Sequence, residues 1–118
     1  MSVHKKRASY NSMEEEINDI FIKIRNITFS SNFLARNSIL LKEEDYPYFS
    51  SGNAKNMYLL FKVRQALFSL DESDRIFIVN EFYYRNEDWW FSLYSRSSFY
   101  RKKKHAMTMF LKYYNLCL

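Results

Sequence analysis

At 118 residues the chain has room for one domain with a modest hydrophobic core. Hydrophobic residues make up 47% of the sequence and aromatic residues 19%, which argues against disorder throughout. The single glycine and single proline argue against a β-sandwich or barrel, because the turns of such folds need these residues every few positions. The composition therefore favours one compact all-α domain, a small bundle of four to five helices.

The formal net charge is +5, from 18 lysines and arginines against 13 aspartates and glutamates. The distribution of the charges says more than the total, because no acid follows Asp88 while six lysines and arginines do. The basic excess therefore lies at the N-terminus and in the C-terminal segment. Such a concentration favours nucleic acid or another anionic partner.

The sequence also indicates the cellular compartment and whether the protein is an enzyme. The single cysteine, Cys117, cannot form an intramolecular disulfide, and no apolar run is long enough to span a bilayer. Basic residues near the N-terminus are not followed by a hydrophobic segment, so a secretory signal is not expected. We expect a cytoplasmic protein without a membrane partner. No motif for a metal, a cofactor or catalysis is found, so we do not expect an enzyme.

Residues 1–11 are expected to be a flexible basic arm, either a solvated terminus or a segment that touches phosphates. Ser12 and Glu15 fit a capping box that would begin an amphipathic helix over residues 13–29. Its apolar face would contain Ile17, Ile20, Phe21 and Ile24.

Residues 30–53 carry the weakest pattern. A short helix around residues 33–41 would end before Pro47, because the residue before a proline is pushed out of the helical region. The acids at 43–45 are interpreted as a solvated loop and not as a metal site, because no histidine or spaced acid supports them. Residues 50–53 are predicted to form a turn.

The middle of the chain predicts further helices. The first covers residues 54–69, with Met57, Leu60, Phe61, Arg64, Leu67 and Phe68 at its buried and bordering positions. A second runs from Glu72 to about Arg85, with Asp71 as its cap. A short helix from residue 86 or 87 to 94 would follow. Its large side chains would fill the space before the last helix: Trp89, Trp90, Phe91 and Leu93.

The most distinctive stretch is SRSSFYRKKKHA, residues 95–106. Ser95 is suited to cap a helix, Phe99 is a single large apolar anchor, and four consecutive cations follow. Apolar positions continue at helical spacing through Ala106, Phe110 and Tyr113 or Tyr114. The pattern predicts a long C-terminal helix that packs one stripe on the body and presents hydroxyls and cations at its N-terminal end.

This stretch resembles the second helix of the helix-turn-helix in region 4 of sigma-70-type factors. It is even more similar to small phage transcriptional regulators of the ArpU type. The resemblance covers about residues 70–116, and divides the domain into an N-terminal helical part, 12–69, and a sigma-region-4-like part, 70–118. Two departures are evident, because no glycine lies in the expected short turn at 93–95 and Lys102 replaces a commonly apolar residue.

The resemblance implies a set of DNA contacts. Arg96, Ser97, Tyr100 and Arg101 would meet base edges, and Ser98 would be a cap partner or phosphate contact. Lys103 and Lys104 would contact phosphates. The expected function is sequence-specific binding of double-stranded DNA in transcription control, with the N-terminal helices completing the core or meeting a second subunit or RNA polymerase. Two alternatives remain: a helical protein-interaction module with a basic face for an acidic partner, and a helical RNA-binding protein.

Overall fold

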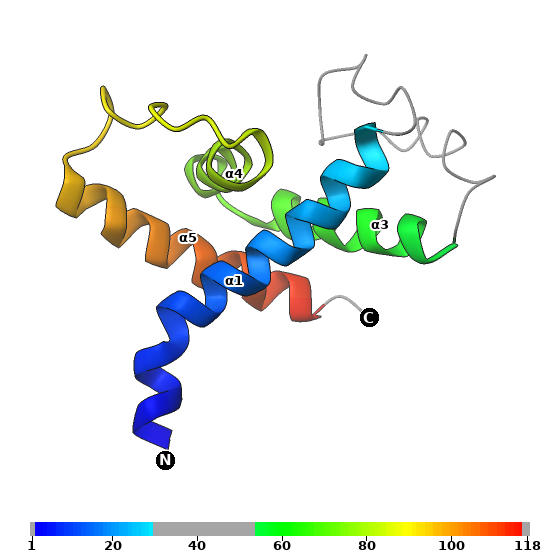
Figure 1. Ribbon diagram of the computed structural model, residues 1–118, viewed down its shortest axis with the longest axis horizontal. Helices are drawn as coiled ribbons and strands as arrows, with labels where there is room; N and C mark the ends of the chain where they lie inside the picture. Colours follow the sequence, from blue (N-terminus) through cyan, green and yellow to red (C-terminus); the bar gives the residue numbers. More distant parts are fainter. Residues whose placement is uncertain (1, 30–53, 117–118) are drawn as a thin grey trace.

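The computed structural model describes residues 2–29 and 54–116, and within them every regular element is a helix. The predicted all-α bundle with a long C-terminal helix is confirmed (Figure 1). The features expected between residues 30 and 53 lie outside the described residues. In chain order the elements are α1 (Ser2–Phe29), α3 (Ala54–Ser69), α4 (Glu72–Ile78), the π-helix η3 (Val79–Tyr84) and α5 (Arg96–Leu116).

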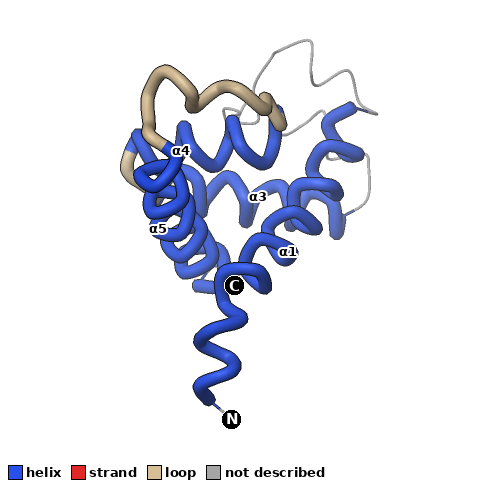
Figure 2. The backbone as a smooth tube through the Cα atoms, turned by 60° about the vertical axis from the view of Figure 1, so that its left-hand side comes forward, coloured by secondary structure: helices blue, strands red, loops and turns tan. Residues whose placement is uncertain are grey.

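The C-terminal helix α5 is the element that joins the others, because it packs against α1, α3 and α4. Helix α1 runs across α5 and α3, and its first turns project beyond the body (Figures 1 and 2). Helix α4 and η3 follow one another without a break and also contact α5 and α1. The N-terminal half of α5 is therefore held between α1 on one side and α4 on the other.

Aromatic rings fill the centre of the bundle. The ring of Phe21 in α1 lies 6.3 Å from Phe82 in η3 and 5.6 Å from Phe110 in α5, measured between centroids. All three side chains are fully buried. Burial of such side chains contributes roughly 1.5–3 kcal/mol each, so this cluster fixes how α1 and η3 sit on α5.

Helix α1 begins earlier than the sequence predicted. It starts at Ser2, so the segment expected to be an arm is helical and Ser12 lies inside the helix. The capping-box prediction was therefore wrong. Tyr10 and Met13 pack against the core, which gives the helix a reason to continue through Ser12. The expected apolar face is present, with Ile17, Ile20, Phe21 and Ile24 buried.

Helix α3 has the predicted bounds but a different buried face. Val63 and Ala66 are buried, whereas Phe61 and Phe68 are exposed. The buried stripe follows the i, i+3, i+4 rule through Leu60, Val63, Leu67 and Leu70. The prediction that Phe61 and Phe68 lie at buried or bordering positions is therefore wrong, because both fall outside this stripe.

The helix predicted from Glu72 is the continuous pair α4 and η3. Asp71 occupies the N-cap position as expected, but its side chain makes no capping hydrogen bond. At the other end Arg85 takes a left-handed conformation with φ 55°, and the N–H of Asn86 donates to the carbonyl of Asn80 at 3.3 Å. This arrangement ends the helix sharply.

The short helix predicted at residues 86–94 does not form. Residues 85–95 connect η3 to α5 through turns, in which the N–H of Trp89 donates to Asn86 and that of Leu93 to Trp90. Trp89 packs on Phe77 and Trp90 on Phe99, so tertiary packing outweighs helix formation in this aromatic segment. Phe91 and Leu93, which were expected to fill the same space, are exposed instead.

Candidate nucleic-acid interface

The N-terminal end of α5 is capped as the sequence predicted. The backbone N–H of Ser98 donates to the Oγ of Ser95 at 3.2 Å, and the N–H of Phe99 donates to the carbonyl of Ser95 at 2.8 Å. The side chain of Ser95 therefore satisfies an N–H group that has no partner within the helix, and its carbonyl accepts the first regular hydrogen bond of α5. The cap fixes where α5 begins and which side chains occupy its first turn.

Phe99 is the buried anchor of this end of α5, with only 3% of its surface exposed. Its ring stacks on Trp90 at 4.2 Å and on Phe77 at 5.2 Å between centroids. The anchor thus joins the first turn of α5 to α4 and to the connection that precedes it. The outward side of the helix is set by this contact.

Five of the seven predicted contact residues lie on exposed positions of the first three turns of α5. Each residue advances about 100° around a helix, so positions four apart form a continuous row. Arg96, Tyr100 and Lys104 form one such row, and Ser97 and Arg101 form the neighbouring one. All five are exposed: Arg96, Ser97, Tyr100, Arg101 and Lys104. We call this set the outer row of α5.

The cations of the outer row are not neutralised by the described part of the chain. Among residues 2–29 and 54–116, no carboxylate forms an ion pair with Arg96, Arg101 or Lys104. Arg101 donates only to the Oγ of Ser98, at 3.3 Å. Ser98 is half-buried; its N–H is the partner of the Ser95 cap, as one of its two expected roles required, and its Oγ accepts the hydrogen bond from Arg101 at the edge of the row.

Lys103 faces inward, in contrast to the expectation that it contacts phosphate. It is 6% exposed, and its Nζ lies 2.5 Å from Glu14 Oε2 in α1 and 2.9 Å from Glu81 Oε2 in η3. The other carboxylate oxygen of Glu81 accepts a hydrogen bond from Trp89 Nε1 at 3.1 Å. An ammonium group enclosed by two carboxylates is not available to a phosphate. Lys103 therefore links α1, η3 and α5 and leaves the set of predicted DNA contacts.

The charge state of Lys103 follows from these contacts. Burial alone would lower the pKa of its ammonium group, but the hydrogen bonds to Glu14 and Glu81 favour the charged form and raise the pKa above 10.5. Tyr10 lies in the same region and its hydroxyl is buried without a hydrogen-bond partner among the described residues. Burial raises the pKa of Tyr10, and the attraction of Lys103 offsets only part of that effect.

A second ion-pair cluster joins the other flank of α5 to α4. Asp74 is buried, with Lys102 Nζ 2.6 Å from its Oδ1 and His105 Nε2 3.2 Å from its Oδ2. Lys102 also donates to Ser73 Oγ at 2.8 Å. Of the four consecutive cations, Lys102 and Lys103 thus bind acids of the same chain, while Arg101 and Lys104 face solvent.

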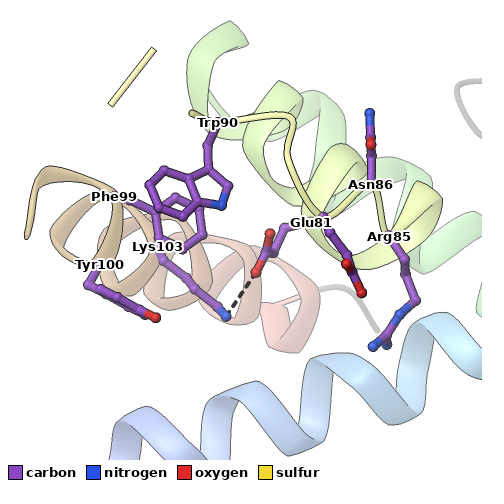
Figure 3. Close-up of a pocket in the computed structure, with 8 residues that line it drawn as sticks. Glu81, Arg85, Asn86, Trp90, Phe99, Tyr100 and Lys103 are labelled. Carbon is purple, nitrogen blue, oxygen red and sulfur yellow. Dashed lines mark ion pairs between the residues drawn. The ribbon is translucent and has the colours of Figure 1, made fainter. Parts of the chain in front are cut away.

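A cavity of about 260 Å³ opens beside the first turns of α5 (Figure 3). Its wall combines the Lys103–Glu81 ion pair with the rings of Trp90, Phe99 and Tyr100. Arg85, Asn86 and Glu87 complete the wall from the connection. The lining thus includes both the buried Lys103 and the exposed Tyr100 of α5.

The sequence did not indicate the acidic partners of Lys103, and the expectation that its side chain faces outward was wrong. Lys103 stands four residues after Phe99 and three before Ala106, so helical spacing alone indicates the buried side. The identity of its partners, Glu14 and Glu81, depends on how α1 and η3 pack and has no local signal. In the segment 1–11, which could touch phosphates, the basic side chains Lys5, Lys6 and Arg7 are outside the described ones.

Comparisons with protein-family models, with curated proteins and with solved structures found no match to this chain. Among the described residues, no helix has the length and apolar character needed to cross a membrane. The same residues contain no group of three or more metal-binding side chains.

Proposed function

We propose that the protein binds double-stranded DNA sequence-specifically through the outer row of α5 and acts in transcription control, without catalysis. One observation carries the proposal: α5 holds Arg96, Tyr100, Arg101 and Lys104 outward from a capped, rigidly anchored helix end. A helix that enters the major groove presents such side chains from its N-terminal turns. Arginine can bind guanine through two hydrogen bonds, and lysine binds phosphate as a point charge.

The charge pattern supports the same proposal. Helix α5 contains no acid, and three acids that approach it, Glu14, Asp74 and Glu81, are already bound to Lys102, Lys103 and His105 on its inward and flanking sides. Approach of a phosphate backbone to the outer row would therefore meet cations without displacing an internal ion pair. The resemblance of residues 70–116 to sigma-type region 4 supports the proposal, with α4 and η3 as the helix that precedes the DNA-binding one.

The connection before α5 differs from the expected short turn, since it spans residues 85–95. Its docking through Trp89 and Trp90 nevertheless holds α4 and the start of α5 together. We therefore propose that the packed connection fixes the orientation of the DNA-binding helix α5, where a short turn with a glycine would do so in the sigma-type pattern.

The experiment is a selection of duplexes from a random-sequence library by the full chain, followed by fluorescence anisotropy on the selected and scrambled duplexes. The proposal expects an enriched motif and a weaker, salt-sensitive affinity for the scrambled duplex. Lys23→Ala is the control for loss of a single positive charge outside the outer row, because Lys23 is an exposed lysine on α1. This variant should keep the preference for the selected duplex. Equal affinity for both duplexes would contradict sequence-specific binding.

A protein-interaction module is the second candidate, and one observation favours it. Phe61 and Phe68 are exposed on α3, and Leu116 is exposed at the end of α5. Exposed apolar groups of this size often mark protein-binding surfaces. On this reading the outer row would meet an acidic polypeptide, and binding to polyglutamate would rival binding to duplex DNA at equal salt.

A further inference from the structure

Two large apolar side chains stand out on the connection that precedes α5. Phe91 is 64% exposed and Leu93 is 65% exposed, more than any other large apolar side chain of the described residues except Leu116. Their neighbours Trp89, Trp90 and Tyr94 all pack against the core. The connection therefore alternates docked and outward side chains, and we refer to Phe91 and Leu93 as the apolar pair.

The apolar pair stands on a rigid base. The ring of Trp90 stacks on Phe99, and its carbonyl oxygen accepts hydrogen bonds from the N–H groups of Leu93 and Tyr94, both at 2.9 Å. The ring of Phe91 lies edge-on to Trp90 with the centroids 4.7 Å apart. The ring of Phe91 and the backbone of Leu93 are thus held by Trp90, the residue that also stacks on the anchor of α5.

The charges around the apolar pair change sign along the chain. Glu87 and Asp88 are exposed before the docked tryptophans, whereas no acid follows them and Arg96 stands three positions after Leu93. A partner that covers the apolar pair together with the outer row of α5 meets Arg96, Arg101 and Lys104 on that side, while the exposed Glu87 and Asp88 lie before the docked tryptophans. This pattern favours an anionic partner with apolar surface to offer between its charges.

We propose that Phe91 and Leu93 form a wedge that enters the minor groove beside the site bound by α5 and partly unstacks one base step. The inference rests on the proposed DNA-binding function and specifies how the duplex is deformed. Apolar side chains inserted between base pairs unstack and kink the duplex, and pyrimidine–purine steps yield most easily. A wedge must be stiff to transmit force, which the packing of Trp90 provides.

Double-stranded DNA is favoured over a lipid surface for two reasons. The buried area that two side chains can add is small for lipid binding, since even one myristoyl chain gives only marginal attachment. In addition, the outer row contributes hydroxyls and cations but no further apolar group except the ring of Tyr100. An anionic lipid surface is therefore kept as an outcome of the test.

The test uses the full chain and a duplex that carries the selected motif and one TA step beside it, in which 2-aminopurine replaces the adenine. Binding of the wild-type chain is expected to raise 2-aminopurine fluorescence, because unstacking relieves its quenching. The Phe91→Ser, Leu93→Ser double variant should lose most of this rise at saturation and bind the duplex about tenfold more weakly. The Ile22→Ser, Ile76→Ser double variant is the matched control, since both isoleucines are exposed on other helices.

The outcomes separate the wedge from the proposed function. If the wild-type chain binds the duplex without a rise in fluorescence, or the wedge variant keeps the full rise, the wedge is wrong and DNA binding stands. If the wild-type chain does not bind the duplex, both ideas fail. Binding to phosphatidylserine vesicles that the wedge variant alone loses, with unchanged DNA binding, would assign the apolar pair to a lipid surface. Unfolding in urea confirms that each variant remains folded.

Discussion

Lys103 and Lys104 are adjacent in the chain, yet α5 turns them to opposite environments. Lys103 is enclosed by Glu14 and Glu81, whereas Lys104 is exposed and has no acid within ion-pair distance among the described residues. A change of about 100° around the helix axis separates the two roles. A run of cations is therefore not one functional unit, because the phase of the helix divides it into structural and solvent-facing members.

The two sides of α5 differ in what their loss should do. The inward side, with Phe99 and Lys103, joins α5 to α1, α4 and η3, so substitutions there should lower stability. The outer row is exposed, and of its members Tyr100 contacts the core edge-on at Phe99, with 5.2 Å between the ring centroids. Substitutions of Arg96, Arg101 and Lys104 should therefore leave stability unchanged and alter DNA affinity. The following predictions test this division from the largest expected effect to the smallest.

Phe99→Ala should lower the free energy of unfolding by about 3–5 kcal/mol, because it removes a buried ring and leaves a cavity. Tyr100→Ala is the matched control on the next residue, and should lower stability by about 1 kcal/mol or less, because Tyr100 is half-exposed and contacts the core through the edge of Phe99. Urea unfolding followed by circular dichroism measures both. Equal losses for the two variants would mean that α5 is oriented differently from this description.

Lys103→Met should destabilise the fold by about 2–4 kcal/mol, because it leaves two carboxylates near each other without their shared cation. Lys104→Met should leave stability almost unchanged. The effects on DNA binding should be reversed. Lys104→Met should reduce the slope of log affinity against log salt concentration by about one unit, and Lys103→Met should leave this slope unchanged. A reduced slope for Lys103→Met, measured where that variant is folded, would return Lys103 to the DNA contacts.

The arginines of the outer row should separate sequence reading from general basicity. Arg96→Ala or Arg101→Ala should weaken binding to the selected duplex by about 1–3 kcal/mol and affect a scrambled duplex less. Fluorescence anisotropy on both duplexes gives the difference. Identical losses on the two duplexes would reduce the outer row to an electrostatic surface.

Much of the fold could be predicted because its signals are local. The bounds of the helix at 54–69, the cap at Ser95 and the anchor Phe99 each depend on residues within a few positions of one another. The start of α1 could not be predicted as reliably, because a plausible cap at Ser12 competes with packing of Tyr10 that only the tertiary structure provides. The same applies to residues 85–95, where aromatic docking replaces a helix.

For the candidate interface, exposure of the outer row follows from the position of Phe99, but the state of its charges does not. Which lysines are neutralised depends on Glu14, Asp74 and Glu81, which come from segments far along the chain. Pairing across such distances is fixed only when the helices pack. The sequence can therefore nominate a basic helix, while the structure is needed to say which of its cations remain free for a partner.

The smallest expected effect concerns pH and the inward side alone. The pKa values of Lys103 and Tyr10 are both raised in the folded chain, the first by hydrogen bonds that outweigh burial and the second by burial. A raised pKa means that the folded chain holds its proton to a higher pH than the unfolded chain does, so unfolding releases protons there. The stability from both groups is therefore fully present below about pH 10, and is lost as the pH rises through the folded-state pKa values.

Urea unfolding at a series of pH values from 8 upward, about 0.5 apart, should show a decline in stability that is shallower in Tyr10→Phe than in the wild-type chain. That variant should be close to wild-type in stability at neutral pH, because it removes a buried hydroxyl that has no described partner. A stability that rises with pH above 10 in the wild-type chain would contradict the assigned environment of Lys103.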